Sequence, residues 1–154
     1  MDKKERFLTA LKQSGHRITG QRRAICEYLA QTREHPTPYQ VYEGVAQEHP
    51  EISLATVYNT LNALRDVGAI VPIDAGNEQT RYETDPAPHI NLVCLRCHRV
   101  FDYEGEPEAE NQLLAAIRAE TGFQPVTKKM EILGFCPECQ AQKRAEIRQQ
   151  LQDK

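Results

Sequence analysis

The segment His89-Ile-Asn-Leu-Val-Cys-Leu-Arg-Cys-His-Arg-Val-Phe-Asp102 is the most informative part of this chain. It reads as two short apolar strands joined by a turn that carries Cys94 and Cys97. A second Cys-x-x-Cys pair, Cys136 and Cys139, follows after 38 intervening residues. Each pair can bind a metal ion from a tight turn, and two pairs form the closed tetrahedral thiolate site that suits structural Zn²⁺. Buried or redox-active thiols and an iron–sulfur centre are the alternatives.

Composition favours a reduced, intracellular protein of two small domains. The chain has 154 residues and a hydrophobic fraction of 40%, and its halves share little pattern. No apolar run approaches the ~20 residues that span a bilayer. The polar N-terminus lacks an apolar signal region, so we expect a cytoplasmic protein without a membrane contact. Thiols stay reduced there, which favours metal binding over disulfides.

Charge is distributed unevenly along the chain, although its net value is only -3. Residues 1–33 contain eight Lys/Arg and three Asp/Glu, a local charge of +5. Residues 34–85 contain two Lys/Arg and nine Asp/Glu, a local charge of -7. A basic N-terminal face could meet phosphate, and a solvated helix face is the alternative.

The first half has the pattern of a winged helix-turn-helix domain. Helices are expected over about 3–14, 20–32, 38–47 and 54–67, followed by strands over 69–74 and 80–83. Thr37-Pro38-Tyr39-Gln40 is a helix start with a capping box. In the fourth helix Leu54, Val57, Leu61 and Leu64 recur at helical spacing, which predicts a buried stripe.

The segment Asp85-Pro-Ala-Pro88 is the best candidate for a hinge. It divides the chain into a domain over 1–84, the hinge over 85–88 and a domain over 89–154. After the two strands around Cys94 we expect a helix over about 108–121, a strand over about 124–134 and a polar C-terminal helix. The fold class is therefore α+β.

A second group of candidate metal ligands is scattered along the sequence. It comprises two imidazoles, two carboxylates and an amide, namely His35, His89, Glu83, Asp102 and Asn91. Such a mixture suits Fe²⁺, Mn²⁺ or Zn²⁺. From residue types alone this signal is weak, because a lone His before a proline or on a strand is more often a surface or packing residue than a ligand.

Several motifs together resemble the ferric uptake regulator family of metal-dependent repressors over nearly the whole chain. They are Gly15-His-Arg-Ile-Thr-Gly-Gln-Arg22, His35-Pro36, Ser53-Leu-Ala-Thr-Val-Tyr-Asn-Thr-Leu61, Arg81-Tyr-Glu83, Cys94-x-x-Cys97 and Gly134-Phe-Cys-Pro-Glu-Cys139. The resemblance implies an N-terminal winged-helix DNA-binding domain and a C-terminal α/β dimerisation domain with a structural zinc site on the four paired cysteines. It also implies regulatory Fe²⁺ or Mn²⁺ at the domain junction, on positions matching His35, Glu83, His89, Asn91 and Asp102.

Two positions are similar to the peroxide-sensing branch of that family. Asp102 stands where iron regulators usually have Glu, and Asn59 stands where they commonly have Arg. Asn91 departs from the family, which usually has a histidine there, and an amide oxygen is a weaker, neutral ligand. In that branch Fe²⁺ and peroxide oxidise histidine, here matching His35 and His89. An iron- or zinc-responsive repressor that ignores peroxide is the alternative.

The resemblance also implies a homodimer that binds a pseudo-palindromic operator in double-stranded DNA. The expected DNA contacts are Lys12, Arg17, Arg22 and Arg23 to phosphates, with Ala55, Thr56, Tyr58 and Asn59 on the recognition helix. Two other classes, a metal hydrolase and a zinc-stapled interaction module, remain. Because no nucleophile motif or H-E-x-x-H helix is present, we expect the protein not to be an enzyme.

Overall fold

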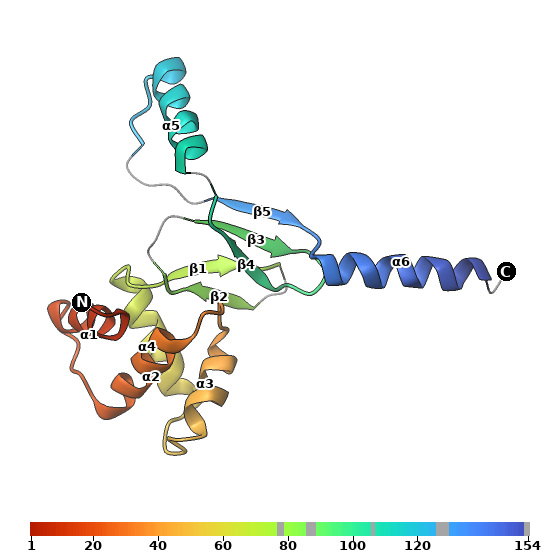
Figure 1. Ribbon diagram of the computed structural model, residues 1–154. Helices are drawn as coiled ribbons and strands as arrows, with labels where there is room; N and C mark the ends of the chain where they lie inside the picture. The colour runs from red at the N-terminus through yellow and green to blue at the C-terminus, as the bar shows by residue number, and fades with distance from the viewer. Residues whose placement is uncertain (77–78, 86–88, 106, 126–129, 153–154) are drawn as a thin grey trace. The chain divides into compact units, whose positions relative to one another are not determined.

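The computed structural model describes residues 1–76, 79–85, 89–105, 107–125 and 130–152 (Figure 1). The chain divides into two compact units, Met1–Pro86 and Ala87–Lys154. Residues 86–88 of the predicted hinge and residues 77–78 of the predicted hairpin loop lie outside the described residues. Among the described residues, no helix combines the length and apolar character needed to cross a bilayer.

The first unit consists of four helices followed by a two-stranded hairpin. The elements are α1 (Lys3–Gln13), α2 (Gly20–Gln31), α3 (Pro38–Ala46), α4 (Leu54–Asp66), β1 (Val71–Asp74) and β2 (Thr80–Glu83). The strands pair antiparallel, with Val71 opposite Glu83. This order is that of a winged helix-turn-helix domain, with β1 and β2 as the wing.

Local side-chain chemistry determines where these helices begin and end. Thr37 Oγ1 accepts from Gln40 N at 3.2 Å, and Gln40 Oε1 accepts from Thr37 N at 2.9 Å, so the predicted capping box is confirmed. Gly15 and Gly68 follow α1 and α4 with φ of +80° and +71°. Only glycine adopts this left-handed conformation without steric cost, which explains both helix ends.

The core of the first unit lies between the four helices and the wing. Its largest fully buried side chains come from every element of the helical part and from the start of the wing, and include Phe7, Leu11, Ile25, Leu29, Val41, Leu61, Leu64 and Ile70. Cys26 is also in this core, and burial raises the pKa of its thiol to about 12. Such a thiol stays protonated and unreactive at neutral pH, in agreement with a packing role.

The second unit is built on a three-stranded sheet. Its elements are β3 (Ile90–Cys94), β4 (Val100–Tyr103), α5 (Pro107–Thr121), β5 (Glu131–Gly134) and α6 (Pro137–Gln152). The strand order is β4-β3-β5, with β4 antiparallel and β5 parallel to β3. The mixed helix and sheet content of the two units confirms the α+β class.

Two expectations about these elements were wrong. Leu54 is 36% exposed, and Thr60 joins Val57, Leu61 and Leu64 in the buried face of α4. As the first residue of the helix, Leu54 lies before the turn that packs on the core. The last strand is also shorter than 124–134, because its pairing with β3 extends only from Glu131 to Gly134 and residues 124–125 and 130 are not in a strand.

The difference between Leu54 and Leu61 gives a stability prediction. Leu61→Ala should lower the free energy of unfolding by about 2–5 kcal/mol, because it removes a fully buried side chain and leaves a cavity. Leu54→Ala, on the same helix, should cost less than about 1 kcal/mol. Urea unfolding of the zinc-loaded protein measures both. Equal losses in the two variants would show that the core does not lie where α4 places it.

Candidate metal centres

Four cysteines converge in the second unit from two turns that are distant in sequence. Cys94 ends β3, Cys97 lies in the following turn, Cys136 follows β5, and Cys139 is in the first turn of α6. Each of the four Sγ atoms lies within 4.8 Å of the others. The pairing of Cys94 with Gly134 in the parallel ladder brings the two turns together. Sequence-distant thiols therefore form one cluster.

The sulfur geometry fits one zinc ion and not a disulfide. The Cys97 and Cys136 Sγ atoms are 3.9 Å apart. Ligands on a tetrahedral zinc with Zn–S bonds of about 2.3 Å lie about 3.8 Å apart, whereas a disulfide needs about 2.05 Å. All four thiols are free, and all but the half-buried Cys97 are buried. The donor set is closed, which makes this a structural zinc site.

Hydrogen-bond donors around the cluster favour thiolates. Burial opposes ionisation of Cys94, but the backbone N–H groups of Cys136, Cys97 and Arg96 outweigh it and lower the pKa to about 6. Burial and neighbouring sulfurs raise the pKa of Cys139 to about 12. Thiolates this close repel one another, so the protons leave at different pH values unless a cation holds all four sulfurs.

Arg99 is a residue of this site that sequence reasoning missed. Its guanidinium donates to Cys97 Sγ at 3.4 Å and to Cys136 Sγ at 3.9 Å, and it also pairs with Glu138. Burial opposes ionisation of Cys97, while the Arg99 donors lower the pKa of that thiol. The position of Arg99 two residues after Cys97 was the only signal in the sequence.

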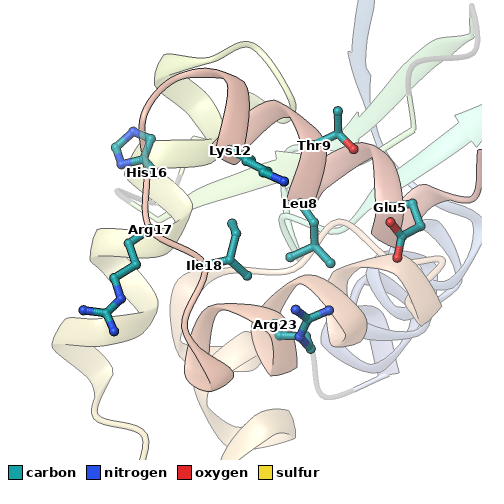
Figure 2. A pocket seen from close by; sticks show the side chains of 8 residues that line it. All are labelled: Glu5, Leu8, Thr9, Lys12, His16, Arg17, Ile18 and Arg23. Atoms are coloured by element: carbon teal, nitrogen blue, oxygen red, sulfur yellow. The ribbon is translucent and has the colours of Figure 1, made fainter.

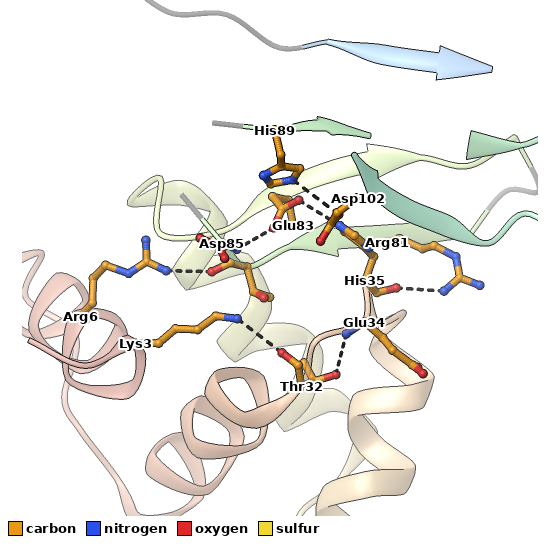
Figure 3. A network of polar contacts seen from close by, with 11 residues as sticks. Lys3, Arg6, Thr32, Glu34, His35, Arg81, Glu83, Asp85, His89 and Asp102 are labelled. Carbon is orange, nitrogen blue, oxygen red and sulfur yellow. Dashed lines mark hydrogen bonds and ion pairs between the residues drawn. The ribbon is translucent and has the colours of Figure 1, made fainter. Parts of the chain in front are cut away.

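The first unit holds an imidazole against a carboxylate. His35 Nε2 lies 2.9 Å from Glu83 Oε2, and the two side chains are 5% and 12% exposed (Figure 3). Two hydrogen bonds from β2 fix both positions, because Tyr82 N donates to Pro36 O at 3.1 Å and the Arg81 guanidinium donates to His35 O at 2.9 Å. The start of α3 is thereby attached to β2, which carries Glu83.

The second unit holds another pair of the same kind. His89 Nε2 lies 3.6 Å from Asp102 Oδ1, with the imidazole nearly buried and the carboxylate half exposed. Asp102 is opposite Asn91 in the β3–β4 ladder, so their side chains lie on one face of the sheet. Asn91 is 6% exposed, and its buried Oδ1 accepts no hydrogen bond from the described residues. A buried amide oxygen without a donor is costly, and a cation would satisfy it.

The predicted DNA-contacting residues lie in two places of the first unit. On α4, Ala55, Tyr58 and Asn59 are exposed and Thr56 is half-buried. Lys12, Arg17 and Arg23 line a cleft of about 510 Å³ formed by α1, α2 and their connection (Figure 2). Arg22 differs, because its Nη1 donates to Arg17 O at 2.7 Å and so also supports that connection.

Comparison with known proteins agrees with this architecture. The model of the ferric uptake regulator family matches residues 13–133. The peroxide-responsive repressor PerR of Staphylococcus aureus is 34% identical over 136 residues, which are 88% of this chain and 90% of that protein. The ferric uptake regulator of Helicobacter pylori has the same fold, with a TM-score of 0.75 at 24% identity over 88% of this chain and 90% of that one. PerR from Streptococcus pyogenes gives a TM-score of 0.51 at 31% identity, and the match covers 90% of this chain and 94% of that one.

Together the fold, the cysteine cluster and the match to the family define a metal-dependent transcriptional repressor. The chain belongs to the ferric uptake regulator family, whose members bind DNA and act as dimers. It has the structural zinc site of four cysteines, and each unit holds one imidazole–carboxylate pair that can bind metal, His35–Glu83 in the first and His89–Asp102 in the second.

The zinc site gives a prediction with a matched control. Cys136→Ala should lose the tightly bound zinc, because three thiolates no longer close the site, and α6 should become sensitive to trypsin at Lys143 and Arg144. Cys26→Ala should retain one zinc per chain, since Cys26 lies in the other core. Elemental analysis after chelator treatment measures both. Full zinc content in Cys136→Ala would refute the assignment.

Proposed function

We propose that this protein is a DNA-binding repressor that senses hydrogen peroxide through a regulatory Fe²⁺ site. The observation that carries the proposal is the presence of one imidazole–carboxylate pair in each unit, His35 with Glu83 and His89 with Asp102. One metal ion shared by both pairs would have two nitrogen and two oxygen ligands. Such a mixed set suits Fe²⁺ or Mn²⁺.

Asn91 completes this proposed donor set. Its buried Oδ1 lacks a hydrogen-bond donor among the described residues, and Asp102 lies beside it on the same sheet face. Oxygen is the donor type that Mn²⁺ prefers. A neutral amide in place of the usual imidazole gives a weaker ligand, so the site would bind metal less tightly than a site with three histidines.

The positions of the ligands in the sequence couple metal binding to DNA binding. His35 and Glu83 precede the segment at residues 85–88, and His89 and Asp102 follow it. A metal that binds both pairs restricts this segment, for which we propose the role of hinge between a DNA-binding domain over 1–84 and a dimerisation domain over 89–154. The metal favours DNA binding only to the extent that it binds the competent arrangement more tightly than the others.

For DNA binding we propose that α4 enters the major groove. Tyr58 and Asn59 are exposed on this helix, where Tyr58 can pack on a thymine methyl and Asn59 can read an adenine edge. Ala55 and Thr56 lie in the first turn of the same helix. Lys12, Arg17 and Arg23 around the α1–α2 cleft, with Arg22 beside them, would contact phosphates and make binding salt-dependent.

For dimerisation we propose the sheet face opposite Asn91. Strand alternation places Phe101, Tyr103 and Ile132 on that face, and all three side chains are exposed. An exposed apolar patch of this kind is typical of a protein–protein interface. A two-fold dimer would carry two copies of α4, which implies a pseudo-palindromic operator.

Peroxide sensing rests on Asp102, on Asn59 and on the 34% identity to the peroxide-responsive repressor of Staphylococcus aureus. Bound Fe²⁺ would supply the redox chemistry that activates hydrogen peroxide next to its ligands. The imidazoles of His35 and His89 lie beside Glu83 and Asp102 and would be the groups oxidised. In the net reaction one oxygen atom is added to a ring carbon and the peroxide is reduced to water. The altered ring no longer binds metal, so the segment at residues 85–88 is no longer restricted and DNA is released.

An iron- or zinc-responsive repressor that ignores peroxide is the second candidate function. Asn91 is the observation that favours it, because the usual regulatory site has a histidine at this position and a changed donor set can change the reactivity of the bound ion.

Metal-dependent DNA binding is tested with two histidine variants of the zinc-loaded protein. His35→Ala should weaken Mn²⁺-dependent operator binding about tenfold or more, a usual size for such coupling, because a ligand is lost. His49→Ala should bind like wild type, since the His49 side chain is half exposed and pairs only with the neighbouring Glu51 in the side-chain contacts described. Titration by fluorescence anisotropy measures both. A wild-type protein whose DNA affinity ignores Mn²⁺ and Fe²⁺ would refute the proposed function.

Peroxide sensing is tested by peptide mass spectrometry. After peroxide, the Fe²⁺-loaded protein should carry one added oxygen atom on the peptides that contain His35 or His89, and DNA affinity should fall in parallel. The Mn²⁺-loaded protein should remain unmodified and bound to DNA. His49 is the internal control, and fragment ions distinguish it from His35, because no Lys or Arg separates the two histidines. Unmodified His35 and His89 with full DNA binding would select the repressor that ignores peroxide.

A further inference from the structure

Three oxygen-bearing side chains form a row across the sheet of the second unit. Asn91 on β3 is the register partner of Asp102 on β4 and of Glu131 on β5. Side chains of register partners lie side by side on one face of a sheet. His89 precedes β3, and its Nε2 lies 3.6 Å from Asp102 Oδ1, so it borders the same row. Glu131 was not among the ligands expected from the sequence.

The middle residue of this row points to a cation. The Asn91 side chain is 94% removed from solvent, since only 6% is exposed, and its Oδ1 has no hydrogen-bond donor in the described part of the chain. Carboxylates flank it on both neighbouring strands. Glu131 Oε1 is itself buried. A buried amide oxygen without a donor is costly beside two carboxylates, and a bound cation stabilises such an arrangement.

We propose that Glu131 is a further ligand of the regulatory metal, an inference that rests on the proposed function of His89, Asn91 and Asp102. Neighbouring strands are about 4.8 Å apart, so a glutamate side chain on β5 is long enough to reach an ion above β3. Its carboxylate supplies the negative charge that the neutral Asn91 does not.

This ligand has a consequence for metal choice. With an amide in place of an imidazole and an additional carboxylate, the donor set of the second unit is rich in oxygen. Hard ions such as Mn²⁺ prefer oxygen donors, whereas Zn²⁺ is bound well by imidazole. Glu131 therefore biases the site toward Mn²⁺ and Fe²⁺ relative to Zn²⁺.

The test is Mn²⁺ binding to the zinc-loaded full chain, measured by the electron paramagnetic resonance signal of free Mn²⁺. Glu131→Gln keeps the shape and removes the charge, and it should weaken Mn²⁺ binding about 10–100-fold. Glu120→Gln, an exposed position on α5, is the matched control and should bind like wild type. Wild-type affinity in Glu131→Gln would overturn the proposal.

Zinc content and circular dichroism report whether Glu131→Gln retains its fold. If it does not, Glu131→Asp keeps the charge but withdraws the carboxylate by one methylene group. This variant should bind Mn²⁺ several-fold more weakly than wild type, and an unchanged affinity would likewise overturn the proposal.

A double-mutant cycle separates a ligand from a residue that only supports the sheet. In the Asn91→His background an imidazole supplies a strong donor, so Glu131→Gln should cost less Mn²⁺ affinity than in wild type. Equal costs in both backgrounds would contradict a shared ion. Failure of wild type to bind Mn²⁺ at all would refute the proposed function, whereas normal wild-type binding with a silent Glu131→Gln would refute this inference alone.

Discussion

The second unit depends on the four sulfur atoms that share one zinc ion. Its parallel contact is short, because β3 and β5 pair over only four register positions, from Asn91–Glu131 to Cys94–Gly134. Within α6, Cys139 is the buried residue, and the rest of the helix is exposed, including the apolar side chains of Ile147 and Leu151. Hydrophobic burial alone therefore holds these elements weakly. Metal binding supplies much of the folding free energy in such small domains. Zinc binding and formation of the sheet are therefore coupled.

The proposed sensor uses the rigidity of this zinc-stapled sheet. Cys94 ends the strand on which Asn91 lies, and Asp102 follows the turn that contains Cys97. The β3–β5 pairing that brings the cysteines together also places Glu131 beside Asn91. The β3–β4 pairing adds Asp102 to the same row. Ligands fixed before the ion arrives lose less conformational entropy on binding. In the first unit, the capping box of α3 and the hydrogen bonds from Arg81 and Tyr82 of β2 hold His35 and Glu83 in the same manner.

Local chemistry and spacing predicted much of this structure from the sequence. Thr37 and Gln40 determine a helix start within four residues, and the two Cys-x-x-Cys pairs predicted the cluster of four cysteines that the structure contains. The burial of Leu54 was predicted wrongly because periodicity does not show at which turn a helix meets the core. Arg99 and Glu131 were missed because their roles depend on strand register and side-chain direction, which no local pattern encodes.

One metal ion bound by ligands from both units should restrict the relative motion of the units. Small-angle X-ray scattering of the zinc-loaded protein, with and without Mn²⁺, measures this restriction. We expect Mn²⁺ to narrow the distribution of interatomic distances, and we expect His35→Ala to abolish this change while structural zinc is retained. Identical scattering with and without bound Mn²⁺ in the wild-type protein would show that the ion does not join the two units.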